Sequence, residues 1–134
     1  MGTWDLGPFD NDSAADFCGS LDRAGEAERA GLLRAALDAA ATAEGYLDGD
    51  EGAPAVAAAA LVAAQLTGGA GSGSAYGPKE PLPELPGDLR PLAVRALDRV
   101  TGGDSELAAL WDDAGHGEMW RRDLGRLRAV LTAP

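Results

Sequence analysis

The sequence predicts an all-α protein, a single compact domain over residues 1–134 with five or six short helices around a central alanine-rich helix. Three observations predict this fold. Apolar residues recur at spacings of three and four along several segments, which is the period of a helix that buries one face. The run from Ala53 to Leu66 is rich in alanine and contains no charged residue, as is typical of a helix buried on most sides. A chain of 134 residues is long enough to bury one ordinary core.

An irregular N-terminal arm is predicted over residues 2–9. This stretch contains two glycines and a proline, which interrupt regular structure, together with large apolar side chains. We expect the arm to lie on the domain rather than in solvent. Trp4 and Phe9 should then be largely buried.

The first helix is predicted to begin at residues 10–13, whose short polar side chains can accept hydrogen bonds from the free N–H groups of a helix start. Ser13 and Asp16 have the spacing of a capping box, with aspartate in place of the usual glutamate. Gly25 ends this helix or separates it from the next. Its inward face is formed by residues at helical spacing, namely Ala14, Phe17, Cys18 and Leu21.

The second helix is predicted from Glu26 to Thr42 because apolar and polar residues fall on different faces of this segment. An acidic, turn-rich link follows over residues 44–51. The residues expected to face inward are Ala30, Leu33, Leu37 and either Ala40 or Ala41, and those expected to face water are Glu28, Arg29, Arg34 and Asp38.

The third helix is predicted from Ala53 to Leu66, with a proline in its first turn and a Gly68–Gly69 stop. Because this helix is apolar on every face, we expect it to be the central strut against which the others pack. A charge introduced at Val56 or Leu61 should then cost several kcal/mol, the usual penalty for an unpaired buried ion.

A long Gly- and Pro-rich loop is predicted at about residues 67–87. Spaced prolines favour extended conformations, and loops of this length are uncommon unless they are functional or disordered. One interpretation is a tether laid over the helices by Leu82 and Leu85. The alternative is a recognition strand for a partner, in which Tyr76 is the binding candidate.

Three further helices are predicted over residues 89–100, 106–114 and 118–131, separated by glycine-containing breaks. Asp88 is expected to cap the first of them. Trp111 and Trp120 are expected to be core anchors, because the chain contains few aromatic residues to fill its core.

The net charge of −11 is concentrated in residues 1–52, which carry twelve acidic and three basic residues. Nucleic acids and anionic membrane surfaces both select basic proteins, so this charge argues against either as the partner. It permits a basic protein as the partner.

The location predicted for the protein is the cytoplasm. The one cysteine, Cys18, excludes an internal disulfide and a multi-cysteine metal site, and this fits a reducing compartment. The N-terminus lacks a basic and apolar signal region, and the longest apolar run, Ala53 to Leu66, is too short to span a bilayer.

The opening Met-Gly-Thr-Trp-Asp-Leu-Gly-Pro-Phe-Asp-Asn-Asp resembles the start of a bacterial family known as domain of unknown function 4259. Members of that family open with Met-Gly-Ala/Thr-Trp-Gly-x-Gly-Pro-Phe-Asp-Asn-Asp and continue into an acidic helix. Asp5 departs from the pattern, which has glycine there. The proline-rich middle and the tryptophan-containing C-terminal helices extend the resemblance over the whole chain. It implies a helical fold and a bacterial source, and it transfers no activity.

Four aspartates near the N-terminus, Asp5, Asp10, Asp12 and Asp16, offer the oxygen ligands that Ca²⁺ and Mg²⁺ prefer. Their spacing does not match the helix-loop-helix calcium motif, because the next ligand position is Ala14 and the glycine and distal glutamate are missing. Capping and turn formation account for these residues without an ion. We therefore predict no metal and no cofactor, and keep the four aspartates as weak binding candidates.

His116 is the one histidine, and histidine is the side chain whose charge changes near neutral pH, so an acid–base enzyme would use it. Its position between two glycines is more typical of an exposed turn, and we keep it as a weak binding candidate. Cys18 lies on the predicted inner face of the first helix, which favours a small apolar role over a nucleophile.

The function that these features favour is a small acidic protein-binding module without enzymatic activity, in its sharper form an immunity-like or antitoxin-like inhibitor of a basic toxin. One alternative is a hydrolase-type enzyme that uses Asp10, Asp12 and His116. Another is a structural or self-associating protein. The sequence leaves the oligomeric state open.

Overall fold

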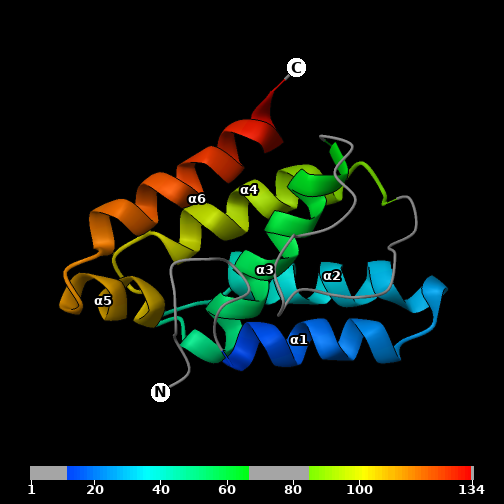
Figure 1. Cartoon of the computed structure of the whole chain (residues 1–134), viewed down its shortest axis with the longest axis horizontal. Helices are drawn as coiled ribbons and strands as arrows, with labels where there is room; N and C mark the ends of the chain where they lie inside the picture. The colour runs from blue at the N-terminus through cyan, green and yellow to red at the C-terminus, as the bar shows by residue number, and fades with distance from the viewer. Residues whose placement is uncertain (1–11, 67–84, 134) are drawn as a thin grey trace.

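The computed structural model describes residues 12–66 and 85–133, without the side chains of Asp12 and Glu26. These residues form an all-helical structure (Figure 1). The predicted fold class is thereby confirmed, while the N-terminal arm with Trp4 and Phe9 and nearly all of the 67–87 loop fall outside the described residues. The helices are α1 (Asp12–Arg23), α2 (Glu26–Ala41), α3 (Gly49–Leu66), α4 (Leu89–Val100), α5 (Glu106–Asp113) and α6 (Gly117–Thr132).

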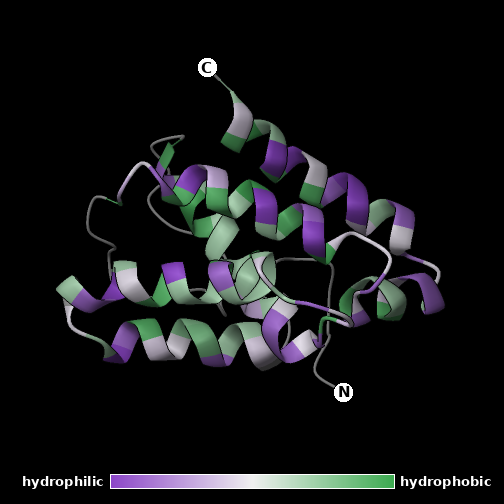
Figure 2. Cartoon of the chain, turned by 180° about the vertical axis from the view of Figure 1, so that it is seen from behind, coloured by the Kyte–Doolittle hydropathy of each residue, from purple (hydrophilic) through white to green (hydrophobic). Residues whose placement is uncertain are grey.

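Helix α3 is the centre of the structure and packs against each of the other five helices (Figure 1). Every residue from Ala55 to Ala63 is buried, and most of these are alanines, whose small side chains let the neighbouring helices approach closely. Seen from behind, the hydrophilic positions recur along α4 and α6, outside this apolar centre (Figure 2). The prediction of a central alanine-rich strut is confirmed.

Helix α3 begins at Gly49, four residues before the predicted start at Ala53, and Pro54 lies inside it. The start is fixed by a distant residue, because the backbone N–H of Gly49 donates to Glu106 Oε1 at 2.6 Å. The carbonyl of Asp48 then accepts the N–H groups of Glu51 and Gly52 at 3.1 and 2.9 Å. Part of the predicted acidic link is therefore the first turn of α3.

The α2–α3 linker, residues 42–48, is fastened to the α4–α5 linker. The Leu47 N–H donates to the Asp104 carbonyl at 2.8 Å, and the Glu106 N–H donates to the Leu47 carbonyl at 2.9 Å. The Leu47 side chain is completely buried. Arg99 of α4 also holds both linkers, because its guanidinium donates to the carbonyls of Ala43, Gly45 and Asp104. This linker thus has a fixed backbone course.

Arg29 corrects the prediction for the outer face of α2. It was expected to face water, yet it is only 9% exposed, and its Nε donates to the Leu21 carbonyl at 3.0 Å. That carbonyl lies near the C-terminal end of α1 and also accepts the N–H of Ala24 at 3.2 Å. Arg29 therefore adds a second donor to the carbonyl and ties α2 to α1.

Two predicted helix caps are also wrong. Ser13 lies inside α1, which already includes Asp12, so it is not the cap of that helix, and its hydroxyl donates to Asp50 Oδ1 of α3 at 3.0 Å. Asp88 precedes α4 but makes no side-chain cap, because Arg34 of α2 donates to both of its carboxylate oxygens at 2.7 and 2.9 Å. Each side chain satisfies a partner on another helix instead of its own helix end.

The C-terminal aromatic residues are core anchors as predicted: Trp111 is 8% exposed and Trp120 is 2% exposed. Leu85, at the end of the predicted loop, packs against the core, and its N–H donates to Gln65 Oε1 at 2.8 Å. This contact agrees with the tether interpretation for Leu85, while Leu82 lies outside the described residues.

Candidate functional site

The candidate residues named from the sequence are not brought together among the described residues. Asp5, Asp10 and Tyr76 lie outside the described residues, and of Asp12 only the backbone at the start of α1 is described. Asp16 is exposed on α1. The enzyme alternative with Asp10, Asp12 and His116 therefore stays untested.

His116 is exposed in the turn between α5 and α6. Its N–H donates to the Trp111 carbonyl at 2.9 Å, and its own carbonyl accepts the Trp120 N–H at 2.9 Å. The imidazole contacts the Trp111 ring edge-on, with ring centroids 6.3 Å apart. The preceding Gly115 has a φ of +81°, a conformation that glycine adopts without strain. These contacts hold His116 in a tight turn.

Cys18 is 1% exposed and belongs to the core cluster. Burial, and to a smaller extent the negative charge of Asp22, raise the pKa of the Cys18 thiol to about 12. Since the thiolate is the nucleophile, a thiol that stays protonated has the small apolar role predicted for it. Within the described ranges, no group of three His, Cys, Asp or Glu side chains is placed to hold a metal ion.

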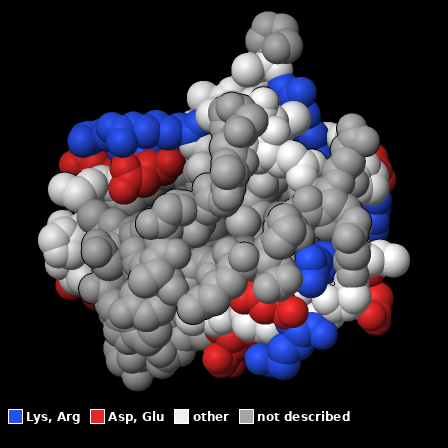
Figure 3. Space-filling view, turned by 45° about the vertical axis from the view of Figure 1, so that its right-hand side comes forward, with Lys and Arg blue, Asp and Glu red and all other residues white. Residues whose placement is uncertain are grey.

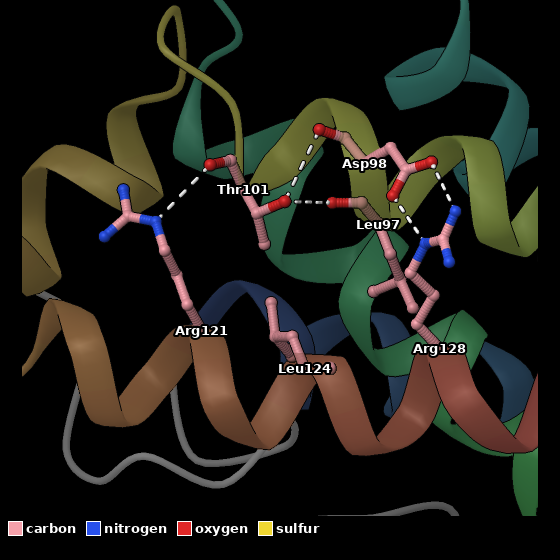
Figure 4. A pocket seen from close by; sticks show the side chains of 7 residues that line it. Leu97, Asp98, Thr101, Arg121, Leu124 and Arg128 are labelled. Carbon is pink, nitrogen blue, oxygen red and sulfur yellow. Dashed lines mark hydrogen bonds and ion pairs between the residues drawn. The ribbon is translucent and has the colours of Figure 1, made fainter.

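A pocket of about 150 Å³ lies between α4 and α6 (Figure 4). We call it the Asp98 pocket. Arg128 donates to both carboxylate oxygens of Asp98 at 2.8 and 3.3 Å, and the Thr101 hydroxyl donates to the Leu97 carbonyl at 2.9 Å. The charge of Asp98 is thus offset by an arginine that also lines the pocket. The pocket is lined by Leu97, Asp98, Thr101, Arg121, Leu124, Gly125 and Arg128.

Arg121, at one end of the Asp98 pocket, joins α5 to α6. It donates to both carboxylate oxygens of Asp112 at 2.7 and 3.2 Å and lies over the Trp120 ring, 5.7 Å from its centroid. The hydrogen bond from Arg121 holds the pKa of Asp112 below its usual value. A Cβ at Gly117 would overlap the carboxylate of Asp112, so any other residue there would force this carboxylate to shift.

A second, larger hollow of about 610 Å³ lies between the start of α4 and the end of α6. We call it the Arg95 groove. Arg90 lies on it and donates through Nε to the Leu131 carbonyl at 2.5 Å and through Nη2 to the Ala133 carbonyl. Arg95 is exposed. The groove is lined by Arg90, Pro91, Val94, Arg95, Leu131, Thr132 and Ala133.

The α2–α3 linker presents an exposed aromatic side chain that the sequence reasoning missed. Tyr46 is 58% exposed, although the rest of its linker is held by backbone hydrogen bonds. Glu44 and Asp48, on either side of it in the chain, are exposed as well. The signal in the sequence is a lone aromatic residue within an acidic, glycine-rich turn.

Charges of opposite sign lie next to one another on parts of the surface, and Figure 3 shows a row of basic side chains directly above acidic ones. Four ion pairs are Arg34–Asp88, Arg121–Asp112, Arg126–Asp123 and Arg128–Asp98. Each takes its carboxylate from residues 88–123. In contrast, Glu44, Asp48 and Glu51 are exposed and form no ion pair with the described residues.

These features define an all-helical protein with a buried alanine-rich centre, an acidic N-terminal part and an ion-paired C-terminal part. Within residues 12–66 and 85–133, no helix combines the length and apolar character needed to cross a bilayer. The chain belongs to the family described as domain of unknown function (DUF4259), whose family model matches residues 2–123. This confirms the family resemblance. No curated protein and no solved structure matches the chain.

Proposed function

We propose that this protein is a protein-binding module without enzymatic activity, and that it holds a basic partner through the acidic surface around the α2–α3 linker. The observation that carries the proposal is the uneven use of acidic residues in ion pairs. The C-terminal part contains eight acidic and seven basic residues from 88 to 134, so it nearly balances its own charge.

The acidic residues of the N-terminal part have no comparable supply of bases. Residues 1–52 contain Arg23, Arg29 and Arg34 against twelve acids. Arg29 is buried, and Arg34 is held by Asp88 of the C-terminal part. The carboxylates of Glu44, Asp48 and Glu51 therefore stay available for a partner. Complementary charge raises the rate of encounter and selects among partners.

The finer form of the proposal is an immunity-like or antitoxin-like inhibitor of a basic toxin. Such an inhibitor acts by binding and needs no reactive group. A preorganised surface favours tight binding, because fewer side chains and loops must be ordered when the complex forms. The fixed course of the α2–α3 linker meets this need, since both its backbone and Arg99 are bonded to the neighbouring linker.

The test measures partner capture from an extract of the source cells, followed by affinity measurement with the purified partner. We expect Glu44→Gln combined with Asp48→Asn to weaken binding at least about tenfold, which is about 1.4 kcal/mol. The matched control is Asp113→Asn combined with Glu118→Gln, which removes the same charge from exposed acids of α5 and α6.

Equal affinity of the Glu44/Asp48 variant and the wild type would refute docking through this surface. An equal loss in the Asp113/Glu118 control would show that net charge alone is sensed. Added salt should slow association of the wild type more than that of the Glu44/Asp48 variant, because surface charge interactions are screened over roughly 8 Å at physiological ionic strength.

A further inference from the structure

The Arg95 groove is a local basic and apolar surface on a protein whose net charge is −11. Its apolar lining includes Pro91 and Ala133, which are exposed, and Val94, which is half-buried. Arg95 is exposed and forms no ion pair with the described residues. The acid nearest to it along α4 on its C-terminal side, Asp98, is already held by Arg128. Among the described residues that line it, the groove therefore has no carboxylate of its own.

Arg90 adds a second positive charge at the groove. Its Nε and Nη2 donate to carbonyls at the C-terminal end of α6, which fixes the guanidinium beside Leu131. Helix C-termini carry a partial negative charge, and Arg90 offsets it. The groove consequently favours a ligand that is apolar at its centre and negatively charged at its edge.

The same chain presents a surface of that chemistry. Tyr46 protrudes from the α2–α3 linker, and the exposed carboxylates of Glu44 and Asp48 flank it along the chain. Arg99 and the backbone bonds of Leu47 hold this linker in place. Presenting Tyr46 therefore requires little further ordering of the backbone.

The Tyr46 surface and the Arg95 groove lie toward opposite ends of α4 (Figure 1). The linker is bonded to Arg99 at the C-terminal end of α4, whereas the groove contains Arg90 and Arg95 near its N-terminal end. One copy can therefore offer both surfaces at once, each to a different neighbour.

We propose that the Tyr46 surface of one copy docks into the Arg95 groove of a second copy. The Tyr46 ring packs against Pro91, Val94 and Ala133, and a carboxylate of Glu44 or Asp48 pairs with Arg95. A two-fold contact of groove against groove would place the two Arg95 side chains against each other, so the contact joins unlike surfaces. Such a contact is reciprocal in a two-fold dimer and head-to-tail in a ring or an open chain.

This association goes beyond the proposed partner function, although both use the acidic linker. A second copy and a basic partner would compete for Tyr46, Glu44 and Asp48. Self-association is measured on the purified protein alone, and partner affinity is measured on the monomer at low concentration. Failure of one proposal therefore leaves the other standing.

The experiment is sedimentation velocity of the purified full chain over a wide concentration range. The wild type should gain mass as its concentration rises, and Tyr46→Ala and Arg95→Glu should each stay monomeric. Arg122→Glu is the matched control, because it reverses an exposed arginine of α6 outside the groove and should associate like the wild type. Circular dichroism confirms that each variant is folded.

A mixture of the two monomeric variants tests directly whether the Tyr46 surface binds the Arg95 groove. Tyr46→Ala keeps an intact groove and Arg95→Glu keeps an intact Tyr46 surface, so the mixture should form a one-to-one dimer and nothing larger. A wild type that stays monomeric throughout overturns the proposal. It is equally overturned by association that survives either variant, by a mixture that stays monomeric, or by an equal loss in Arg122→Glu.

Discussion

Replacement of Leu47 by alanine tests whether the α2–α3 linker belongs to the core. The side chain of Leu47 is completely buried and lies within the core cluster beside Gly52. Its backbone is bonded to Asp104 and Glu106, so the linker cannot readily collapse into the space that the truncated side chain leaves. Leu→Ala at buried sites costs about 2–5 kcal/mol, and the upper half of that range is expected at a site that cannot close.

The assay is urea unfolding followed by circular dichroism. With a denaturant slope of about 1–3 kcal/mol per molar urea, typical of small proteins, the unfolding midpoint of Leu47→Ala should fall by about 1–5 M. Tyr46→Ala is the matched control in the same linker, because Tyr46 is 58% exposed. Its free energy of unfolding should stay within about 0.5 kcal/mol of the wild type. A loss below about 1 kcal/mol for Leu47→Ala would refute the core assignment of the linker.

Three further substitutions test the core and its corrections. Val56→Asp places a charge at a position of α3 that is 4% exposed and should lower the free energy of unfolding by at least about 3 kcal/mol. Leu66→Asp, at the exposed end of α3, should lower it far less. Equal urea midpoints for the two variants would count against a buried α3. Arg29→Ala removes a charged donor to the Leu21 carbonyl and should lower the unfolding free energy by about 1–3 kcal/mol, while no change would show that this contact adds nothing to stability. The pKa of the native Cys18 thiol is about 12 against an ordinary value of 9.0, so the native state keeps a proton that the unfolded state releases, and stability should fall as pH rises from about 9 toward 12. Urea unfolding across that pH range should show that the free energy of unfolding depends less on pH in Cys18→Ala than in the wild type. An identical pH dependence in the two proteins would contradict the raised pKa.

The local pattern of the sequence was sufficient to predict the helices. Helix α4 has the predicted bounds, residues 89–100, because its apolar spacing is regular and turn residues flank it. The start of α3 could not be predicted in the same way. Its first N–H is bonded to Glu106, a residue far along the chain, and a local pattern contains no record of such a partner.

The sequence pattern also could not predict which charged residues are buried or paired. Arg29 and Arg34 occupy polar positions of α2, and the pattern assigned both to water. In the structure Arg29 is buried against the end of α1, while Arg34 is 44% exposed and holds Asp88. Helical periodicity predicts which face a residue occupies, but the packing of other helices decides what covers that face.

The candidate surfaces were predicted only in part. The excess of acids in the N-terminal part follows from composition, but the roles proposed for Tyr46 and Arg95 depend on tertiary structure. The linker that carries Tyr46 is fixed by Arg99, and Arg95 lies beside a groove between α4 and α6. Neither arrangement is visible in the spacing of residues along the chain.

The ion pairs divide the carboxylates into two groups with different capacities for binding. Asp98 and Asp112 each accept two hydrogen bonds from an arginine of the same molecule. A basic partner would have to displace that arginine, so it gains little by contacting either residue. Glu44 and Asp48 have no such competitor among the described residues, so a partner displaces no arginine when it contacts them. We therefore expect recognition of a basic surface, whether on a partner or on a second copy, to depend on the linker acids and to be insensitive to Asp98 and Asp112.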